Sequence, residues 1–319
     1  MRDPKVIVRD SLVYAKEQRA RSWWHLLSTL ALVAALAAAI TLVTPWPIRL
    51  AASAMLGLVL VRMFILYHDF QHGAILQNSA FASLLMRGYG MLVLNPESIW
   101  VRSHDHHHRN VGRIYGASIG SYPLMTRAAW ARASRWQRLR YAAMRHPITI
   151  ALGYVTIFLY GMCIRSFLVD RRKHRDAGLA IGLHALLVVT LAFVAPSLLL
   201  FLILVPMTIA GALGAYLFYA QHNYPSVRIL DGEQWTYLAA ALQSSSYIRM
   251  GPAMRWFTGN IGFHHVHHVN AKIPFYRLPE AMAGIAELQA PGTTSLSPRQ
   301  VWQCLRLRLW DPELGRMVR

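Results

Sequence analysis

The chain contains little cysteine and few acidic residues. Its 319 residues include two cysteines, Cys163 and Cys304, which form no CxxC motif. A disulfide framework is therefore not expected, and the cysteines give no spacing for an iron–sulfur cluster or a cysteine-bound zinc ion. Asp and Glu number 14 against 33 Lys and Arg, so the formal net charge is +19.

The sequence also lacks a polar or Pro/Gly-rich linker, an internal repeat and a low-complexity tract. We therefore expect a single domain over residues 1–319. Hydrophobic residues make up 55% of the chain, which suits a membrane protein better than a soluble domain. An excess of basic residues can indicate nucleic-acid binding, but a nucleic-acid-binding protein does not need long apolar runs. The expected partners are the bilayer with its anionic headgroups and an acidic soluble protein, with no nucleic acid.

Long apolar runs predict membrane spans, since a helix needs about 20 apolar residues to cross a bilayer. Breaks at Pro45–Pro47 and at Pro196–Ser197 are too short to hold a domain, so each flanking pair is expected to form a helical hairpin. Arg49 and Arg62 lie near the ends of the second span, where snorkelling is expected. Four segments qualify as spans: residues 26–44, 48–67, 179–195 and 198–219.

The charge distribution predicts the membrane topology. Lys and Arg accumulate in cytoplasmic loops. They are frequent in the N-terminal arm, in the middle of the chain and at residues 171–175, and absent from both hairpin turns. Four crossings place every basic block, and both termini, in the cytoplasm. The weaker apolar stretches 81–94 and 148–168 are expected to be interfacial or re-entrant helices. The predicted fold is an all-α integral membrane protein with four transmembrane helices in two hairpins, interfacial helices, and a cytosolic helical cap formed by residues 68–178 and 220–319.

Eleven of the fifteen histidines fall in four short clusters near these spans. Positions i, i+3 and i+4 of a helix share one face. The spacing therefore makes three imidazoles of each H-x-x-H-H box converge, and it turns His106 and His265 away. A H-x-x-x-H pair and a single histidine beyond the fourth span complete the set. The convergent imidazoles are His68, His72, His104, His107, His108, His222, His264, His267 and His268.

This number of imidazoles suits two metal ions, because a tetrahedral zinc site takes only four ligands. Imidazole suits Zn, Cu, Fe and Ni, and neither Cys nor Met lies in the boxes, so ligand type leaves the metal open. Asp69 and Asp105 flank ligand histidines and are candidates to orient imidazoles by hydrogen bonding. The alternative for each is a solvated or helix-capping acid.

At these residues the chain resembles the membrane fatty acid desaturase superfamily. The motifs are HDxxHG at residues 68–73, WVRSHDHHH at 100–108 and NIGFHHVHH at 260–268. The segments LFYAQH at 217–222 and AKIPFYRL at 271–278 resemble bacterial and cyanobacterial acyl-lipid desaturases. The box order and spacing are highly specific to this family.

The resemblance implies two iron ions, held in a cytosolic cap by the nine histidines. It implies an O2-dependent removal of two hydrogens from an acyl chain of a lipid or carrier-bound fatty acid. The two electrons would come from a separate donor such as ferredoxin, because no fused cytochrome b5 signature is evident. A bacterial inner membrane with a cytoplasmic metal site is the implied location.

The chain departs from the family pattern near the fourth span. Some acyl-CoA desaturases have an Asn one turn before the equivalent of His222, where it contacts a metal-bound water. Phe218 stands there in this chain, which removes that contact or moves it to another residue such as Asn223. Asn260, beside the third box, is a further candidate to support the ligands.

The reaction outcome stays open at this stage. A hydroxylase on the same di-iron scaffold would differ only in how the substrate is placed. A histidine-rich membrane metal transporter is the alternative from another class, although transport sites usually lie near the bilayer midplane.

Overall fold

The computed structural model describes residues 2–114 and 120–319, and these residues are mostly helical. They group into two compact units. Unit 1 comprises Met1–Glu17, Ser103–Ile150 and Tyr216–Arg319, and unit 2 comprises Gln18–Arg102 and Ala151–Ala215. Helices α5 (Glu97–Asn110) and α12 (Val205–His222) begin in unit 2 and end in unit 1.

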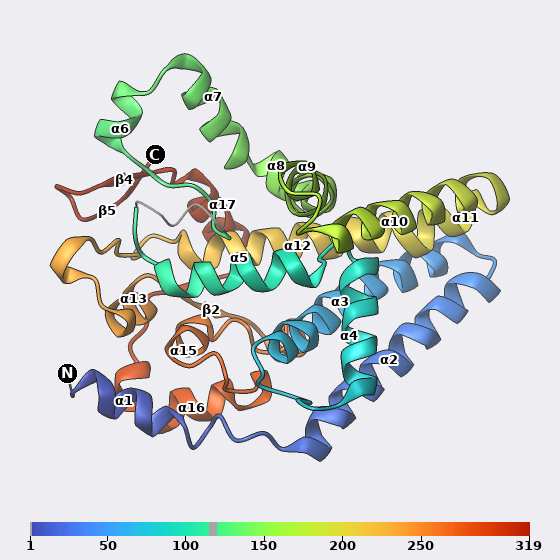
Figure 1. Ribbon diagram of the computed structural model, residues 1–319, viewed down its shortest axis with the longest axis horizontal. Helices are drawn as coiled ribbons and strands as arrows, with labels where there is room; N and C mark the ends of the chain where they lie inside the picture. Colours follow the sequence, from blue (N-terminus) through green and yellow to red (C-terminus); the bar gives the residue numbers. More distant parts are fainter. Residues whose placement is uncertain (1, 115–119) are drawn as a thin grey trace. The chain divides into compact units, whose positions relative to one another are not determined.

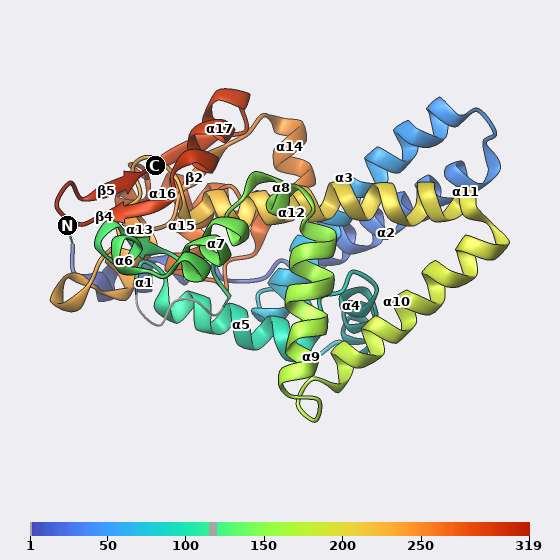
Figure 2. The same ribbon diagram turned by 90° about the horizontal axis from the view of Figure 1, so that it is seen from above.

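The long apolar helices confirm the four predicted spans. They are α2 (Arg19–Leu42), α3 (Trp46–Gln71), α10 (Arg175–Val194) and the continuous helix Pro196–His222. The last consists of α11 (Pro196–Leu198), the π-helical segment η2 (Leu199–Leu204) and α12. Pro45 and Pro196 end the preceding helices as predicted, and α2 packs beside α3 (Figures 1 and 2).

The two weaker apolar stretches form shorter helices. Residues 81–94 lie mainly in α4 (Ala80–Leu92). The second stretch forms α8 (Pro147–Ala151), the π-helical segment η1 (Tyr154–Ile164) and α9 (Arg165–Val169). Neither stretch is among the four helices of the described residues that are long and apolar enough to be candidate spans: α4 has 13 residues, and Tyr154–Val169 is a shorter apolar helix.

Arg62 differs from the sequence prediction. Its side chain is only 2% exposed, its Nε donates to Thr29 Oγ1 at 3.2 Å, and its Nη2 lies 3.0 Å from His25 Nδ1. Both partners belong to α2, so the guanidinium is held between two helices. The predicted snorkelling of Arg62 is wrong, because charge near a span end does not reveal a polar partner on the neighbouring helix.

Glycine allows α12 and η1 to meet at backbone distance within unit 2. A Cβ atom added to Gly211 would lie 2.5 Å from the backbone nitrogen of Tyr154. The same atom added to Gly214, one turn along α12, would lie 3.7 Å from the ring of Phe158. Small residues commonly allow such close helix packing in membrane proteins.

Unit 1 combines short helices with two small sheets. In the first sheet β1 (Met125–Thr126) pairs in parallel with β4 (Leu309–Asp311), which pairs antiparallel with β5 (Arg316–Val318). In the second, β2 (Tyr247–Arg249) pairs in parallel with β3 (Thr293–Ser295). Met125 lies opposite Leu309, and Tyr247 lies opposite Thr293.

The remaining elements of unit 1 are short, and many begin with proline or a capping side chain. At the start of α7, Ser134 Oγ accepts a hydrogen bond from the backbone N–H of Gln137. The Gln137 side chain in turn accepts one from the backbone N–H of Ser134. The helices are α1 (Pro4–Ser11), α6 (Arg127–Arg132), α7 (Arg135–Met144), α13 (Tyr237–Gln243), α14 (Pro252–Phe257), α15 (His264–Val269), α16 (Leu278–Gly284) and α17 (Pro298–Arg306). Single 3-10 turns are η3 (Gly232–Gln234), η4 (Phe275–Arg277) and η5 (Ala286–Leu288).

Candidate metal centre

Unit 1 brings imidazoles together from three helices: α5, the end of α12, and α15. The Nε2 atom of His222 lies 3.0 Å from those of both His107 and His264. The Nε2 atom of His268 lies 3.0 Å from that of His264. One ligand atom from each of these four residues fits within 4.8 Å of the others. We call this set the unit 1 cluster.

Three more imidazoles of unit 1 adjoin the unit 1 cluster. The Nε2 atom of His108 lies 3.1 Å from that of His104 and 3.0 Å from that of His267. The His108 ring stacks on His268, with centroids 4.2 Å apart. All three are buried. The second and third boxes therefore converge as their spacing predicts.

The first box lies in unit 2, at the end of α3. The rings of His68 and His72 have centroids 4.6 Å apart, which agrees with one helix face. His68 Nδ1 lies 3.0 Å from Asp69 Oδ1, and Asp69 is buried. The Trp100 ring packs edge-on against both imidazoles.

Hydrogen bonds at Nδ1 orient two rings of the unit 1 cluster, those of His222 and His107. His222 Nδ1 lies 2.9 Å from the carbonyl oxygen of Ser244. A carbonyl only accepts, so Nδ1 carries the proton and Nε2 of the neutral ring keeps a lone pair. His107 Nδ1 lies 2.7 Å from Ser121 Oγ, a hydroxyl that orients the ring and is able to accept the Nδ1 proton. A metal ion among the four Nε2 atoms would give their lone pairs one common partner, so the donor set fits a metal.

Burial favours the neutral form of two imidazoles of the third box, His268 and His265, by lowering their pKa. The pKa of His268 lies well below its usual range because of burial and the neighbouring imidazoles. Burial likewise lowers the pKa of His265 to about 4. A neutral imidazole is the form that binds metal, so metal need not displace protons from His268.

His106 and His265, which the helical spacing turns away, and the candidate Asp105 occupy other positions. His265 Nε2 donates to the carbonyl of Leu288 at 3.0 Å, away from the cluster. His106 is not part of the unit 1 cluster. The Asp105 side chain is half-exposed and lies 3.8 Å from Arg109 in an ion pair.

The side chains of Asn260 and Asn223 donate hydrogen bonds to backbone carbonyl groups. Asn260 adopts a φ of +54° in the turn before α15, and its Nδ2 donates to the carbonyl of Phe275. Asn223 accepts from Arg145 and donates to the carbonyls of Cys304 and Leu307. Phe218 forms an apolar wall, with its ring centroid 5.2 Å from that of His107.

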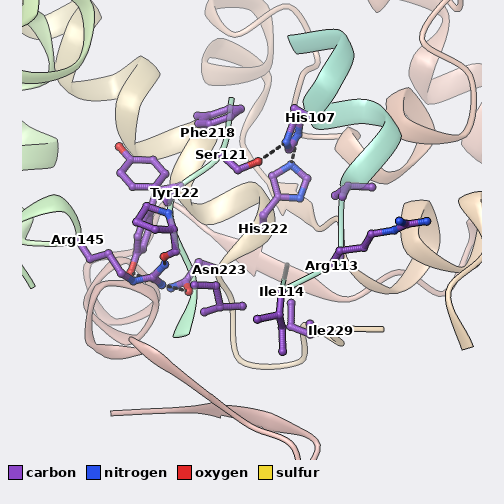
Figure 3. A pocket seen from close by; sticks show the side chains of 15 residues that line it. His107, Arg113, Ile114, Ser121, Tyr122, Arg145, Phe218, His222, Asn223 and Ile229 are labelled. Atoms are coloured by element: carbon purple, nitrogen blue, oxygen red, sulfur yellow. Dashed lines mark hydrogen bonds between the residues drawn. The ribbon is translucent and has the colours of Figure 1, made fainter. Parts of the chain in front are cut away.

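A cavity of about 120 Å³ opens beside the cluster within unit 1. Figure 3 shows His107, Ser121 and His222 on its wall, together with Arg145 and Tyr122. Ser121 could not be predicted as a site residue, because a serine outside a motif does not reveal its hydrogen-bond partner. Arg145 belongs to the basic middle of the sequence, and its charge alone does not predict that its side chain is buried, with an exposed fraction of 2%.

Apolar helices long enough to span a bilayer and a converging set of imidazoles define a helical membrane protein with a candidate metal centre. Residues 44–299 match the fatty acid desaturase family. A fatty acid desaturase of Bacillus subtilis (strain 168) is 32% identical over 267 residues, covering 81% of this chain and 74% of the relative. The probable fatty acid desaturase DES1 of Sorghum bicolor is 26% identical over 276 residues, covering 82% of this chain and 69% of that protein.

The chain therefore belongs to the fatty acid desaturase family. It is an oxidoreductase of the membrane with a lipid substrate, as the histidine motifs predicted. The comparisons confirm the predicted resemblance to bacterial desaturases.

Proposed function

We propose that this protein is an O2-dependent di-iron desaturase that introduces a double bond into the acyl chain of a lipid or carrier-bound fatty acid. Family membership supports the reaction class. The observation that carries the metal assignment is the convergence of four Nε2 atoms in the unit 1 cluster. Zinc has no redox chemistry, so iron suits an oxidoreductase with this donor set.

The proposed ligands are the nine histidines predicted from the sequence. Seven of them approach one another in unit 1, and His68 and His72 share one face at the end of α3. The iron pair would supply the activation of O2. The residues of the chain orient the imidazoles through Ser121, the Ser244 carbonyl and Asp69, and exclude water by burying them.

We also propose that the chain forms one domain and that it resides in a bacterial inner membrane. Both termini and the metal site would then lie in the cytoplasm. The support is the distribution of Lys and Arg, which avoids the two hairpin turns. A separate carrier such as a ferredoxin would supply the two electrons. The basic excess of the chain favours an acidic carrier.

Expression in a host that lacks desaturation, followed by lipid mass spectrometry with double-bond localisation, tests the reaction. We expect a new double bond that depends on O2. His267→Ala should abolish both iron loading and the product while leaving the protein in the membrane. His265→Ala is the matched control, because that ring points away from the cluster.

Three outcomes would contradict the proposal or a part of it. A hydroxylated chain without a new double bond would establish the hydroxylase alternative. Iron accumulation that tracks expression, with no O2-dependent change in the lipids, would favour the transporter alternative. Unchanged iron content in His267→Ala would refute the ligand set.

A further inference from the structure

Exposed arginines gather on α6 and α7 of unit 1, a segment that we call the basic hairpin (Arg127–Met144) and in which Arg127 forms an ion pair with Asp311. The sequence contains neither Asp nor Glu between Asp105 and Asp170. Arg132, Arg135 and Arg140 are exposed on the basic hairpin. Figures 1 and 2 show α6 and α7 following one another along this segment. An acidic protein surface would complement it.

Aromatic rings lead inward from the basic hairpin. Trp130 of α6 lies 5.6 Å from the ring of Tyr141, which is buried. The Arg145 guanidinium carbon lies 5.6 Å from the centre of the Tyr141 ring and 5.0 Å from that of Tyr219. The guanidinium therefore lies close to both rings.

The contacts continue from Tyr219 to the unit 1 cluster. The Tyr219 and Tyr122 ring centroids are 4.9 Å apart, and Tyr122 lies 6.1 Å from Phe218. Phe218 lies 5.2 Å from the imidazole of His107. Figure 3 shows Tyr122 and Phe218 on the wall of the cavity that also holds His107. The series thus runs through contacts from a charged surface to a proposed metal ligand.

We propose that the basic hairpin is the docking surface for a reduced, acidic one-electron carrier protein, and that this series of rings is the electron route to the metal centre. The inference rests on the proposed function. Each encounter oxidises the carrier by one electron and reduces the centre by one. Two encounters supply the two electrons which, with two protons from water, convert O2 and the two hydrogens removed from the acyl chain into two waters.

The series of contacting rings favours a carrier over a lipid headgroup as the occupant of the basic hairpin. Electron tunnelling falls steeply with distance, so a carrier benefits from bonded and contacting groups between its docking site and the acceptor. A headgroup gains nothing from such a route.

The docking step is tested with the iron-loaded protein in nanodiscs of neutral lipid. Anaerobic stopped-flow mixing with a reduced plant-type ferredoxin follows oxidation of the carrier by absorbance. We expect Arg132→Glu/Arg135→Glu/Arg140→Glu to lower the association rate by about tenfold or more at low ionic strength, because steering contributes about 10- to 1000-fold. High salt should remove the difference.

The matched control makes the same charge change elsewhere in unit 1, by Arg249→Glu/Arg299→Glu/Arg319→Glu. These arginines are also exposed. Equal rates for the two triple variants would overturn the docking surface, since only net charge would then matter. A difference confined to discs with anionic lipid would also overturn it and would assign the basic hairpin to headgroups.

The route is tested separately from docking. Trp130→Leu removes a ring that is only partly buried, whereas Trp130→Phe keeps one. At saturating carrier we expect Trp130→Leu to slow the first-order electron transfer, with an unchanged dissociation constant, and Trp130→Phe to stay close to the wild type. An unchanged first-order rate in Trp130→Leu would refute the route.

A small-molecule reductant separates this inference from the proposed function. Desaturation driven by reduced methyl viologen should persist in the hairpin and Trp130 variants, because the reductant needs no docking surface. If the wild type binds iron and desaturates but the variants accept carrier electrons normally, only the inference fails. If the wild type neither binds iron nor accepts electrons, the proposed function fails with it.

Discussion

Replacing Ser121 by alanine should weaken metal binding at the unit 1 cluster. The Ser121 hydroxyl lies 2.7 Å from His107 Nδ1 and is the group that orients this ring toward His222. Loss of a group that orients a metal-binding histidine costs about 10- to 100-fold in metal affinity. That factor corresponds to about 1.4–2.8 kcal/mol. Ser121→Thr keeps the hydroxyl and should retain most of the affinity.

Ser245→Ala is the matched control for Ser121→Ala. Ser245 is fully buried next to Ser244, and its hydroxyl has no hydrogen-bond partner among the described residues. The chemical change is the same, but no imidazole loses its orienting group. Anaerobic competition between the protein and a chromophoric iron(II) chelator gives both dissociation constants. Equal constants for Ser121→Ala and Ser245→Ala would show that the hydroxyl does not position a ligand.

Thermal unfolding in detergent tests three further positions, one in the helix packing of unit 2 and two in unit 1. Gly211→Ala should destabilise the protein relative to Gly214→Ala by about 1–3 kcal/mol of overpacking, because only the first new methyl group meets backbone. Asn260→Ala should cost about 1–2 kcal/mol because of the positive φ, and Asn260→Gly should cost less. Arg145→Met should lower the free energy of unfolding by about 1–3 kcal/mol, because it leaves buried acceptors unpaired. Arg145→Lys should recover only part of that free energy.

The membrane helices could be predicted from the sequence because length and hydropathy determine them. Each observed span contains most of its predicted segment, and each hairpin breaks at the expected proline. The helices extend beyond the apolar runs, as α3 does from Tyr67 to Gln71, because backbone hydrogen bonding continues where hydropathy ends. The strands were not predicted, since pairs of two or three residues such as β1 show no period.

Convergence within each histidine box could also be predicted, because it follows from helical spacing alone. The supporting contacts could not. Ser121, the Ser244 carbonyl and Arg145 reach the site through loops and tertiary packing, and no spacing in the sequence links them to an imidazole. The charge pattern of the sequence identifies the basic middle of the chain, but it does not distinguish buried Arg145 from exposed Arg140.

The groups that orient the unit 1 cluster are uncharged, and this affects how a bound metal would behave. His222 is held by a backbone carbonyl and His107 by a hydroxyl. Neutral imidazoles with neutral partners leave the charge of a metal ion undiminished, and burial strengthens its field. The metal-loaded cluster should therefore bind small anions such as azide, with a change in the optical spectrum that the metal-free protein does not show. Asp69 beside His68 is the contrasting case, because a carboxylate adds negative charge to the imidazole that it orients.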